Sequence, residues 1–441
     1  MASGAGTAQA PGEPGIPYWS PATRLAFRFC FLYFGLYCLL TQILTGFIQL
    51  PDQEIPDLAT RWPLRLVPQW AATHLFRITA PLAFGDTGSG DRMFDWVLVA
   101  CLLAIAALGA GIWSLVDSRR RSYLSLHNWF RVFLRFALAG QMLAYGFVKV
   151  VPMQMPFPFL TKLVEPFGNF SPMGVLWASI GASPAYERFA GSAEMLAGVL
   201  LILPRTALLG ALVCLADVIQ VFMLNMTYDV PVKLLSFHLI LLSLVLLAPD
   251  FSRLYAFFFS NRSMEGRSNV EPFTTPRAMR ISFVAQIIFG LWLFGANLYA
   301  VRSEWFKYGG GQPKSELYGI WNVDQMVVDG QVRSALIGDY DRWQRVIFDY
   351  PTSVSFQRMD SSQVRYGAAI NTQDKTLAVT KFSDTNWKAN FTFQRESQDH
   401  LVLDGTMDGH KLHLDMKLMD RNKFLLVNRG FHWIQDFPFN R

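Results

Sequence analysis

Charged side chains are scarce in this chain of 441 residues, where Asp, Glu, Lys and Arg together make up only 16%. A soluble globular domain carries about a quarter charged residues, so the composition argues against a soluble fold. Hydrophobic residues make up 52%, and the mean hydropathy is +0.24. These values are typical of a protein that crosses a membrane several times.

Cysteine is also rare and shows no functional spacing. The four cysteines form no C-x-x-C pair and all lie in apolar stretches, so we expect small core residues rather than disulfides, a thioredoxin-like centre or a zinc site. His127 and His410 are single histidines without the spacing of metal ligands. We therefore predict no metal site.

The N-terminus lacks the features of a signal peptide. Residues 1–20 are rich in Ala, Gly and Pro, contain no basic cluster, and are not followed by a short apolar core with an A-x-A cleavage site. We expect a disordered tail before a first membrane span.

Long apolar stretches are abundant. A helix needs about 20 mostly apolar residues to cross a bilayer, and seven stretches qualify: 25–48, 94–116, 127–150, 185–203, 205–226, 231–249 and 281–301. Only Pro204-Arg205 separates the fourth stretch from the fifth, and proline interrupts a helix, so these two stretches are predicted to form a tight hairpin.

Basic residues predict the orientation of these spans. They gather after the second span, at the hairpin turn, and between the sixth and seventh spans, which lie on one side of a seven-span topology. The positive-inside rule then places the N-terminus in the cytoplasm and the C-terminal part on the extracytoplasmic (periplasmic) side of the inner cell membrane. The same loops explain the net charge of +6, so the expected partner is the lipid bilayer and no nucleic acid.

Two loops on the opposite side, 56–84 and 151–183, combine tryptophan and phenylalanine with proline. Aromatic residues of this kind favour the headgroup layer, so we expect short surface or re-entrant helices that form a lid. Plain interfacial anchors are the alternative.

The pattern changes after the last span. Gly309-Gly310-Gly311-Gln312-Pro313 predicts a flexible hinge, and short alternating stretches rich in Val, Phe, Tyr and Thr follow from Leu317. Turns at Asp329-Gly330, Asp404-Gly405 and Asp408-Gly409 favour hairpins. Eight or nine up-and-down strands predict a small closed barrel or sandwich. The predicted strands are 317–328, 344–350, 352–358, 363–370, 376–382, 388–394, 400–404, 410–417 and 422–428.

Acidic residues inside the apolar stretches are the strongest functional signal. Glu194 and Asp217 lie at similar distances from the hairpin turn, which puts them within about one helical turn of the same depth. Two such carboxylates need a proton or a cationic partner. His238 is the candidate partner, and a His–Asp pair would relay protons. Alternatively, His238 is neutral and bonds to a serine hydroxyl or a backbone carbonyl.

Further polar residues lie toward one end of the neighbouring spans. Gln141, Tyr145 and Lys149 share a face of the third span, and Lys233 opens the sixth. One polar cavity in spans three to six that opens outward would account for all these groups. Lysines that extend to the headgroups, and scattered structural ion pairs, are the alternatives.

Residues from about 130 to 250 resemble the DoxX family of small membrane proteins. The resemblance rests on Tyr145-Gly146-Phe-Val-Lys149, which matches the family's G-x-x-K, and on Glu194-Met-Leu-Ala-Gly198, which matches its E-x-x-x-G. It implies a four-helix bundle and a link to quinone-dependent redox chemistry. Tyr228-Asp229-Val-Pro231-Val-Lys233 is similar to the last helix of a longer DoxX-like subgroup.

The β region has a weaker resemblance. Gly319-x-Trp321 followed by a DG turn resembles the first strand of lipocalin-like domains, and Arg429 would be the arginine that packs on that tryptophan. A barrel of this kind can hold a small apolar ligand. A docking module or a structural cap is the alternative.

We therefore predict a multi-pass α-helical membrane bundle followed by an exported all-β barrel-like domain. Its parts are a disordered tail (1–20), two N-terminal spans with an outer interfacial loop (21–126), a DoxX-like four-helix core (127–250), a cytoplasmic loop with the seventh span and the glycine-rich hinge (251–311), and the β domain (312–441).

Three hypotheses for function follow. In the first, the core binds a quinone or a similar lipophilic molecule in a quinone-linked oxidoreductase or a subunit of one. Glu194, Asp217 and His238 would then handle protons, and Tyr145, Lys149 and Lys233 would bind the ligand. The second is a carrier or binding protein without chemistry. The third is a membrane anchor whose β domain docks an extracytoplasmic or membrane protein partner.

Overall fold

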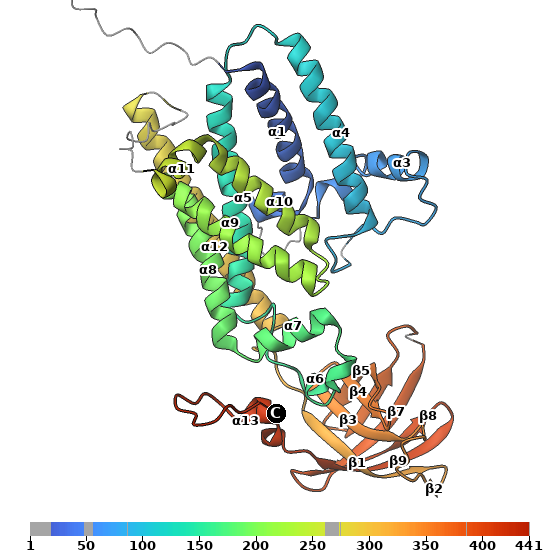
Figure 1. The fold of residues 1–441 in the computed structure, drawn as a ribbon. Helices are drawn as coiled ribbons and strands as arrows, with labels where there is room; N and C mark the ends of the chain where they lie inside the picture. The colour runs from blue at the N-terminus through green and yellow to red at the C-terminus, as the bar shows by residue number, and fades with distance from the viewer. Residues whose placement is uncertain are drawn as a thin grey trace, which may run out of the picture. The chain divides into compact units, whose positions relative to one another are not determined.

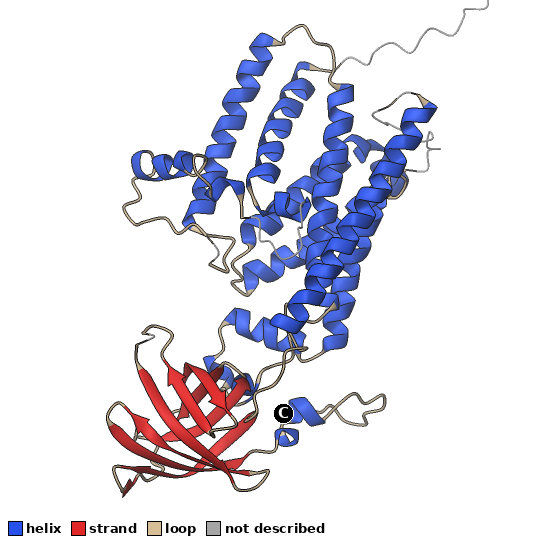
Figure 2. Cartoon of the chain, turned by 180° about the vertical axis from the view of Figure 1, so that it is seen from behind, coloured by secondary structure: helices blue, strands red, loops and turns tan. Residues whose placement is uncertain are grey.

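The computed structural model describes residues 19–47, 56–85, 87–260, 273, 275–384 and 386–440. The predicted tail 1–20 lies almost wholly outside these residues. The chain divides into two compact units, each assembled from two segments. The helical unit comprises Met1–Val151 and Arg188–Ser303, and the barrel unit comprises Pro152–Glu187 and Glu304–Arg441 (Figures 1 and 2).

Helices coincide with all seven predicted spans. These helices are α1 (Pro21–Leu40), α4 (Met93–Val116), α5 (Leu124–Val150), α8 (Pro184–Ile202), α9 (Ala207–Thr227), α10 (Lys233–Leu247) and α12 (Pro276–Lys307). Shorter elements of the same unit are α2 (Gln42–Phe47), η1 (Leu58–Thr60), α3 (Leu66–His74), η3 (Ala248–Asp250) and α11 (Phe251–Phe259). The first predicted span is interrupted at Thr41, where α1 ends. The hairpin between α8 and α9 is confirmed.

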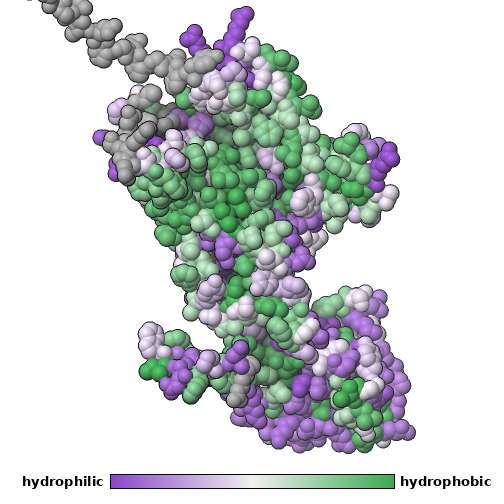
Figure 3. Space-filling view, viewed as in Figure 1, coloured by the Kyte–Doolittle hydropathy of each residue, from purple (hydrophilic) through white to green (hydrophobic). Residues whose placement is uncertain are grey.

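Within the described part of the chain, five helices are long and apolar enough to cross a membrane: α1, α4, α9, the continuous segment Lys233–Phe259, and α12. Large apolar side chains on α4 are exposed, among them Leu108 and Leu115, although water would disfavour such exposure. Hydrophobic residues cover the visible face of the helices, whereas hydrophilic ones dominate the barrel surface (Figure 3). The exposed apolar surface of these helices suits contact with lipid.

Glycines let α5 and α8 pack with their backbones close together. A Cβ added to Gly191 would lie 2.7 Å from the carbonyl oxygen of Gly146, and one added to Gly146 would lie 2.9 Å from that of Gly191. Only residues without side chains fit such a contact. Gly146 and Gly191 thus permit the close approach of α5 and α8.

Eight antiparallel strands close into a barrel in the described part of the barrel unit. They are β1 (Gly319–Val328), β3 (Trp343–Tyr350), β4 (Ser353–Arg358), β5 (Gln363–Asn371), β6 (Thr376–Thr380), β7 (Lys388–Arg395), β8 (His400–Met407) and β9 (His410–Leu418). Neighbours in sequence pair in order, and β1 pairs with β9 to close the ring. A short strand, β2 (Gln331–Val332), extends β1.

Two of the three predicted DG turns are confirmed. Asp329-Gly330 and Asp408-Gly409 have positive φ at both residues, as a tight hairpin turn requires. Asp404-Gly405 instead lies inside β8, where Gly405 faces Phe391 of β7 so closely that a Cβ would overlap it. The predicted strand 422–428 is also wrong: this segment forms η4 (Arg421–Lys423) and α13 (Leu425–Asn428).

Apolar side chains fill the barrel. Trp321 is fully buried and donates its indole N–H to the carbonyl of Leu317 at 2.8 Å. The guanidinium of Arg395, not Arg429, lies over the Trp321 ring, at 5.7 Å from its centroid. The expected role of Arg429 is therefore wrong, because a residue of β7 takes that place.

The glycine-rich segment after α12, predicted to be a hinge, forms a hydrogen-bonded turn within the barrel unit. The N–H groups of Gly309 and Gly311 donate to the carbonyl of Trp305, at 3.1 and 3.2 Å. The segment also wraps the indole ring, since a Cβ added to Gly310 would lie 2.5 Å from it.

The predicted lid 151–183 belongs largely to the barrel unit and contains α6 (Leu160–Leu163), η2 (Phe167–Asn169) and α7 (Pro172–Gly181). Asp349 of β3 accepts hydrogen bonds from the N–H groups of Leu160 (3.0 Å) and Thr161 (3.1 Å). Leu160 packs on Ile320 and Ile347 of the outer barrel surface. Burial raises the pKa of Asp349, although these hydrogen bonds act in the opposite direction. Part of the expected lid is therefore a cover on the barrel wall.

Candidate functional site

An ion pair between α5 and α8 forms the centre of the candidate site. The Lys149 ammonium contacts the Glu194 carboxylate, and the two residues are only 8% and 3% exposed. The glycine contact between the same helices brings the two side chains together, since Gly191 packs against Lys149 itself. Lys149 is therefore the cationic partner of Glu194, a role for which His238 was the predicted candidate. Its ammonium is held by this carboxylate and does not simply extend to the headgroups.

Asp217 of α9 is the second acid of this site. It is half-buried, its charge acts on Glu194, and the charge of Lys149 acts on it. Among the described residues, neither the second oxygen of Glu194 (Oε2) nor Oδ2 of Asp217 has a hydrogen-bond partner, although both atoms are buried. Buried acceptors of this kind are costly unless something donates to them. These two buried acceptor atoms would suit a group that carries hydrogen-bond donors.

Tyr145 lies one helical turn before Lys149 on α5. Its hydroxyl accepts from Nε2 of Gln42 at 3.5 Å, and Nε2 of Gln141 donates to the Gln42 carbonyl at 3.4 Å. Gln42 comes from α2, after the break at Thr41, and sequence reasoning missed it. An amide at the end of an apolar stretch was the available signal.

His238 belongs to a different cluster, and its expected pairing with Asp217 is wrong. Nδ1 of His238 lies 2.6 Å from the carbonyl oxygen of Leu234, and Nε2 lies 2.7 Å from the Tyr33 hydroxyl. The imidazole also stacks on Tyr37, with ring centroids 3.8 Å apart. Both ring nitrogens are thus used by α1 and by the preceding turn of α10, which matches the alternative of a histidine bonded to a backbone carbonyl.

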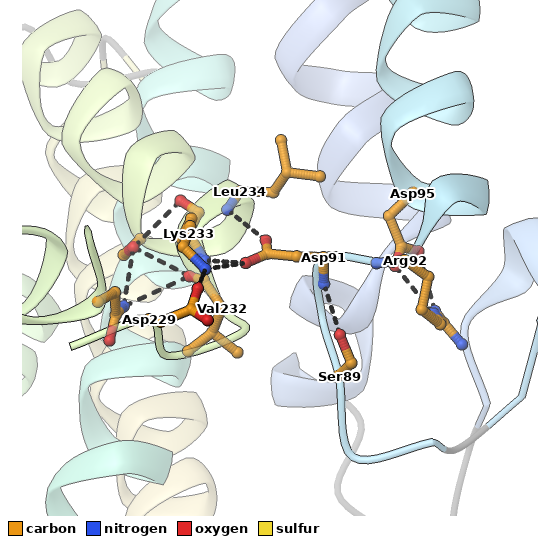
Figure 4. A network of polar contacts seen from close by, with 10 residues as sticks. Ser89, Asp91, Arg92, Asp95, Asp229, Val232, Lys233 and Leu234 are labelled. Carbon is orange, nitrogen blue, oxygen red and sulfur yellow. Dashed lines mark hydrogen bonds and ion pairs between the residues drawn. The ribbon is translucent and has the colours of Figure 1, made fainter. Parts of the chain in front are cut away.

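Lys233 is also held elsewhere. Its ammonium lies 3.0 Å from Asp229 and 3.8 Å from Asp91. Asp91 also accepts from the backbone N–H groups of Lys233 and Leu234, both at 2.8 Å, and so caps α10 (Figure 4). These contacts tie the loop before α4 to the start of α10. The Lys233 ammonium is therefore held by Asp229 and Asp91, and among the described residues no ion pair or hydrogen bond joins it to Lys149 or Glu194.

A comparison with curated proteins gives one informative match. Over 121 residues, the chain is 36% identical to the uncharacterized protein YwoB of Bacillus subtilis (strain 168). The match covers 27% of this chain and 74% of that protein. The chain belongs to the YwoB family. No family model matches it, and no solved structure matches it.

In this member of the YwoB family, further buried charges connect the helices. Arg131 of α5 pairs with Asp250 of η3, directly after α10, at 2.9 Å, and Arg28 of α1 donates to the Tyr123 hydroxyl at 2.6 Å. Sequence reasoning gave neither contact, although both arginines interrupt apolar stretches. The described residues contain no group of three or more potential metal ligands.

The barrel unit has a separate cleft of about 460 Å³ beside the cover segment. Arg365 and Asp349 lie in its wall with the aromatic residues Phe159, Tyr308 and Tyr350. Arg365 is exposed and donates one hydrogen bond to the Ser353 hydroxyl at 3.1 Å. The cleft lies on the outer surface of the barrel, and the buried apolar core occupies the interior.

Proposed function

We propose that α5, α8, α9 and α10 form a DoxX-like four-helix core that binds a quinone-like lipophilic molecule beside Lys149, Glu194 and Asp217. The observation that carries this proposal is the pair of buried acid oxygens without partners, Glu194 Oε2 and Asp217 Oδ2, next to a buried lysine. A ligand that donates to these atoms would remove their desolvation cost.

The side chains fit a quinone and its reduced form. A quinol carries two hydroxyl groups, which would donate to Glu194 and Asp217, and a quinone carries two carbonyls, which would accept from Lys149 and Tyr145. When bound, such a molecule supplies a redox couple of two electrons and two protons. The redox role itself rests on the resemblance to DoxX proteins.

The chain's own residues would hold and move protons. Lys149 keeps one Glu194 oxygen in an ion pair, so the exchangeable proton would be on Oε2 or on Asp217 Oδ2. Two carboxylates that share one cation favour uptake of a proton by one of them. Gln42 would orient the Tyr145 hydroxyl. His238 and Lys233, engaged elsewhere, would support the helices around this site.

We also propose that the helical unit spans the inner membrane with the N-terminus in the cytoplasm and the barrel unit on the extracytoplasmic side. Contacts between the segments predicted to be cytoplasmic support this orientation. The backbone N–H of Trp19 donates to the carbonyl of Arg121, and Arg131 pairs with Asp250. The N-terminus of α1, the basic α4–α5 connection and the end of α10 thus lie at one end of the unit, as the positive-inside rule requires.

The test is to purify the chain from cell membranes and to look for a quinone by native mass spectrometry and by chromatography of solvent extracts. We expect a quinone with the wild-type chain, and a loss of most of it with Glu194→Gln or Asp217→Asn. The matched control is Glu165→Gln, which alters a carboxylate of the barrel unit. The absence of any quinone from wild-type extracts, or equal retention by all variants, would refute the proposal.

A non-catalytic carrier or binding protein is the second candidate, and the cleft beside Arg365 favours it. A polar cleft with three aromatic residues would receive a ligand or a partner peptide on the barrel. A co-purifying molecule that is lost with Arg365→Ala and kept with Glu194→Gln would support this function over the quinone site.

A further inference from the structure

The chain after the barrel exposes an unusual number of aromatic side chains. Beyond α13, Phe431 is 82% exposed, Trp433 87%, Ile434 80% and Phe437 84%. Large apolar residues at this exposure favour contact with a partner or a lipid surface.

One arginine closes residues 429–439 into a loop. Nη2 of Arg429 donates to the side-chain oxygen of Gln435 at 2.8 Å, and its guanidinium lies 4.0 Å from the ring centroid of Phe439. Gly430 has φ +65°, which turns the chain directly after this arginine. The loop therefore presents residues 431–434 as a tip, in which the rings of Phe431 and Trp433 lie 5.8 Å apart.

The chemistry of this loop fits the surface of a bilayer. Tryptophan and phenylalanine favour the headgroup layer, and arginine or lysine beside them favours lipid phosphates. Arg429 lies at the base of the loop, and Arg421 and Lys423 lie in the preceding turn. The loop is too short to span, and it contains Asp436 and Pro438. Because the same chain contains helices that can cross a membrane, a bilayer is always tethered near this loop, and even a weak affinity suffices.

We propose that residues 429–439 form an interfacial anchor, whose tip residues Phe431, Trp433 and Ile434 enter the headgroup region of the bilayer. The base cations face the lipid phosphates. This anchor restrains the barrel unit at the membrane surface, in addition to its covalent links through α5, α8 and α12. It is independent of the ligand in the helical unit.

The experiment uses the full chain in nanodiscs of phosphatidylcholine and phosphatidylglycerol. The four cysteines are replaced by alanine, and an environment-sensitive fluorophore is attached to His432→Cys, which leaves the three apolar tip residues in place. We expect blue-shifted emission and at least twofold quenching by lipids with a shallow spin label. The same fluorophore at Gln373→Cys, in an exposed turn of the barrel, is the control and should show neither effect.

The substitutions Phe431→Ser, Trp433→Ser and Ile434→Ser together should abolish the quenching at position 432. Emission at 432 that matches the control at 373 would overturn the proposal. Blue-shifted emission without quenching by the lipid label would also overturn it, because protein rather than lipid would then cover the tip. Hydroxyl-radical footprinting of the unmodified chain gives a second test: Phe431 should be oxidised several-fold less than Phe382, which is 65% exposed on the barrel. Equal oxidation of the two residues would contradict the anchor.

Discussion

Removal of Lys149 is the sharpest test of the ion pair in the helical unit. In the Lys149→Met variant, Glu194 stays buried and loses its cation, while the charge of Asp217 remains nearby. The side chains of the pair are 10% and 4% exposed, so water does little to compensate the isolated carboxylate. Breaking a buried pair from one side costs about 3–5 kcal/mol of folding free energy.

The exposed pair between Lys162 and Glu165 is a matched control. Its Nζ–Oε2 distance is 2.6 Å, but the lysine side chain is 42% exposed. Pairs of this kind contribute roughly 0–1 kcal/mol, so Lys162→Met should have at most a small effect. Both variants replace a paired lysine by methionine, and they differ in how deeply that lysine is buried.

Thermal unfolding in nanodiscs, followed by circular dichroism, measures the effect. A loss of 3–5 kcal/mol should lower the unfolding temperature by roughly 6–20 °C for a unit of this size. The double variant Lys149→Met, Glu194→Gln should regain at least half of that loss, because no uncompensated charge then remains at Glu194. If Lys149→Met behaves like Lys162→Met, or if the double variant is as unstable as the sum of the single ones, the reasoning is wrong.

Two further predictions concern other parts of the chain. A methyl group at Gly405 would overlap Phe391 and the Asn390 carbonyl, so Gly405→Ala should destabilise the barrel by about 1–3 kcal/mol. Gly338 has open space around it, so Gly338→Ala should be neutral. Hydrogen exchange of β7 and β8 in the full chain measures both effects. Burial raises the pKa of Asp57, in the loop before η1, to about 6. An acid whose pKa is raised in the folded state stabilises that state at low pH, and this stabilisation is lost as the pH rises. The difference in unfolding temperature between the wild type and Asp57→Asn should therefore shift against the wild type as the pH rises from about 4 to 7. A constant difference over that range would contradict the shift.

The sequence predicted the helices and strands well, because both follow from local patterns. Length and hydropathy were enough to predict the long helices, and alternation with turn residues was enough to predict the eight strands of the barrel. Asp404-Gly405 shows the limit of this approach. The same dipeptide makes a turn at 408–409 and a close strand contact at 404–405, and only the pairing of β8 with β7 distinguishes them.

The two acids of the candidate site were predictable from the sequence, but the pairing of His238 with Asp217 was wrong. Depth along a helix could be counted from the hairpin turn, which brought Glu194 and Asp217 together. The direction in which a side chain points around the bundle could not be counted, so His238 was assigned to Asp217 although it faces Tyr33 of α1. The prediction that Arg429 packs on Trp321 was wrong for the same reason, because Arg395 of β7 lies over that ring.

The cover on the barrel wall has a consequence for synthesis of the protein on the ribosome. Leu160 bonds to Asp349, which lies 189 residues further along the chain. The helices α9, α10 and α12 must all be translated before Asp349 exists. Until then, Leu160 and its apolar neighbours have no barrel wall to pack against. Segments made early fold early, and the helical unit is therefore expected to assemble first. The barrel unit cannot close until its last strand, β9, has been made. We expect its slow step to be the docking of β3 on Leu160, which is synthesised much earlier.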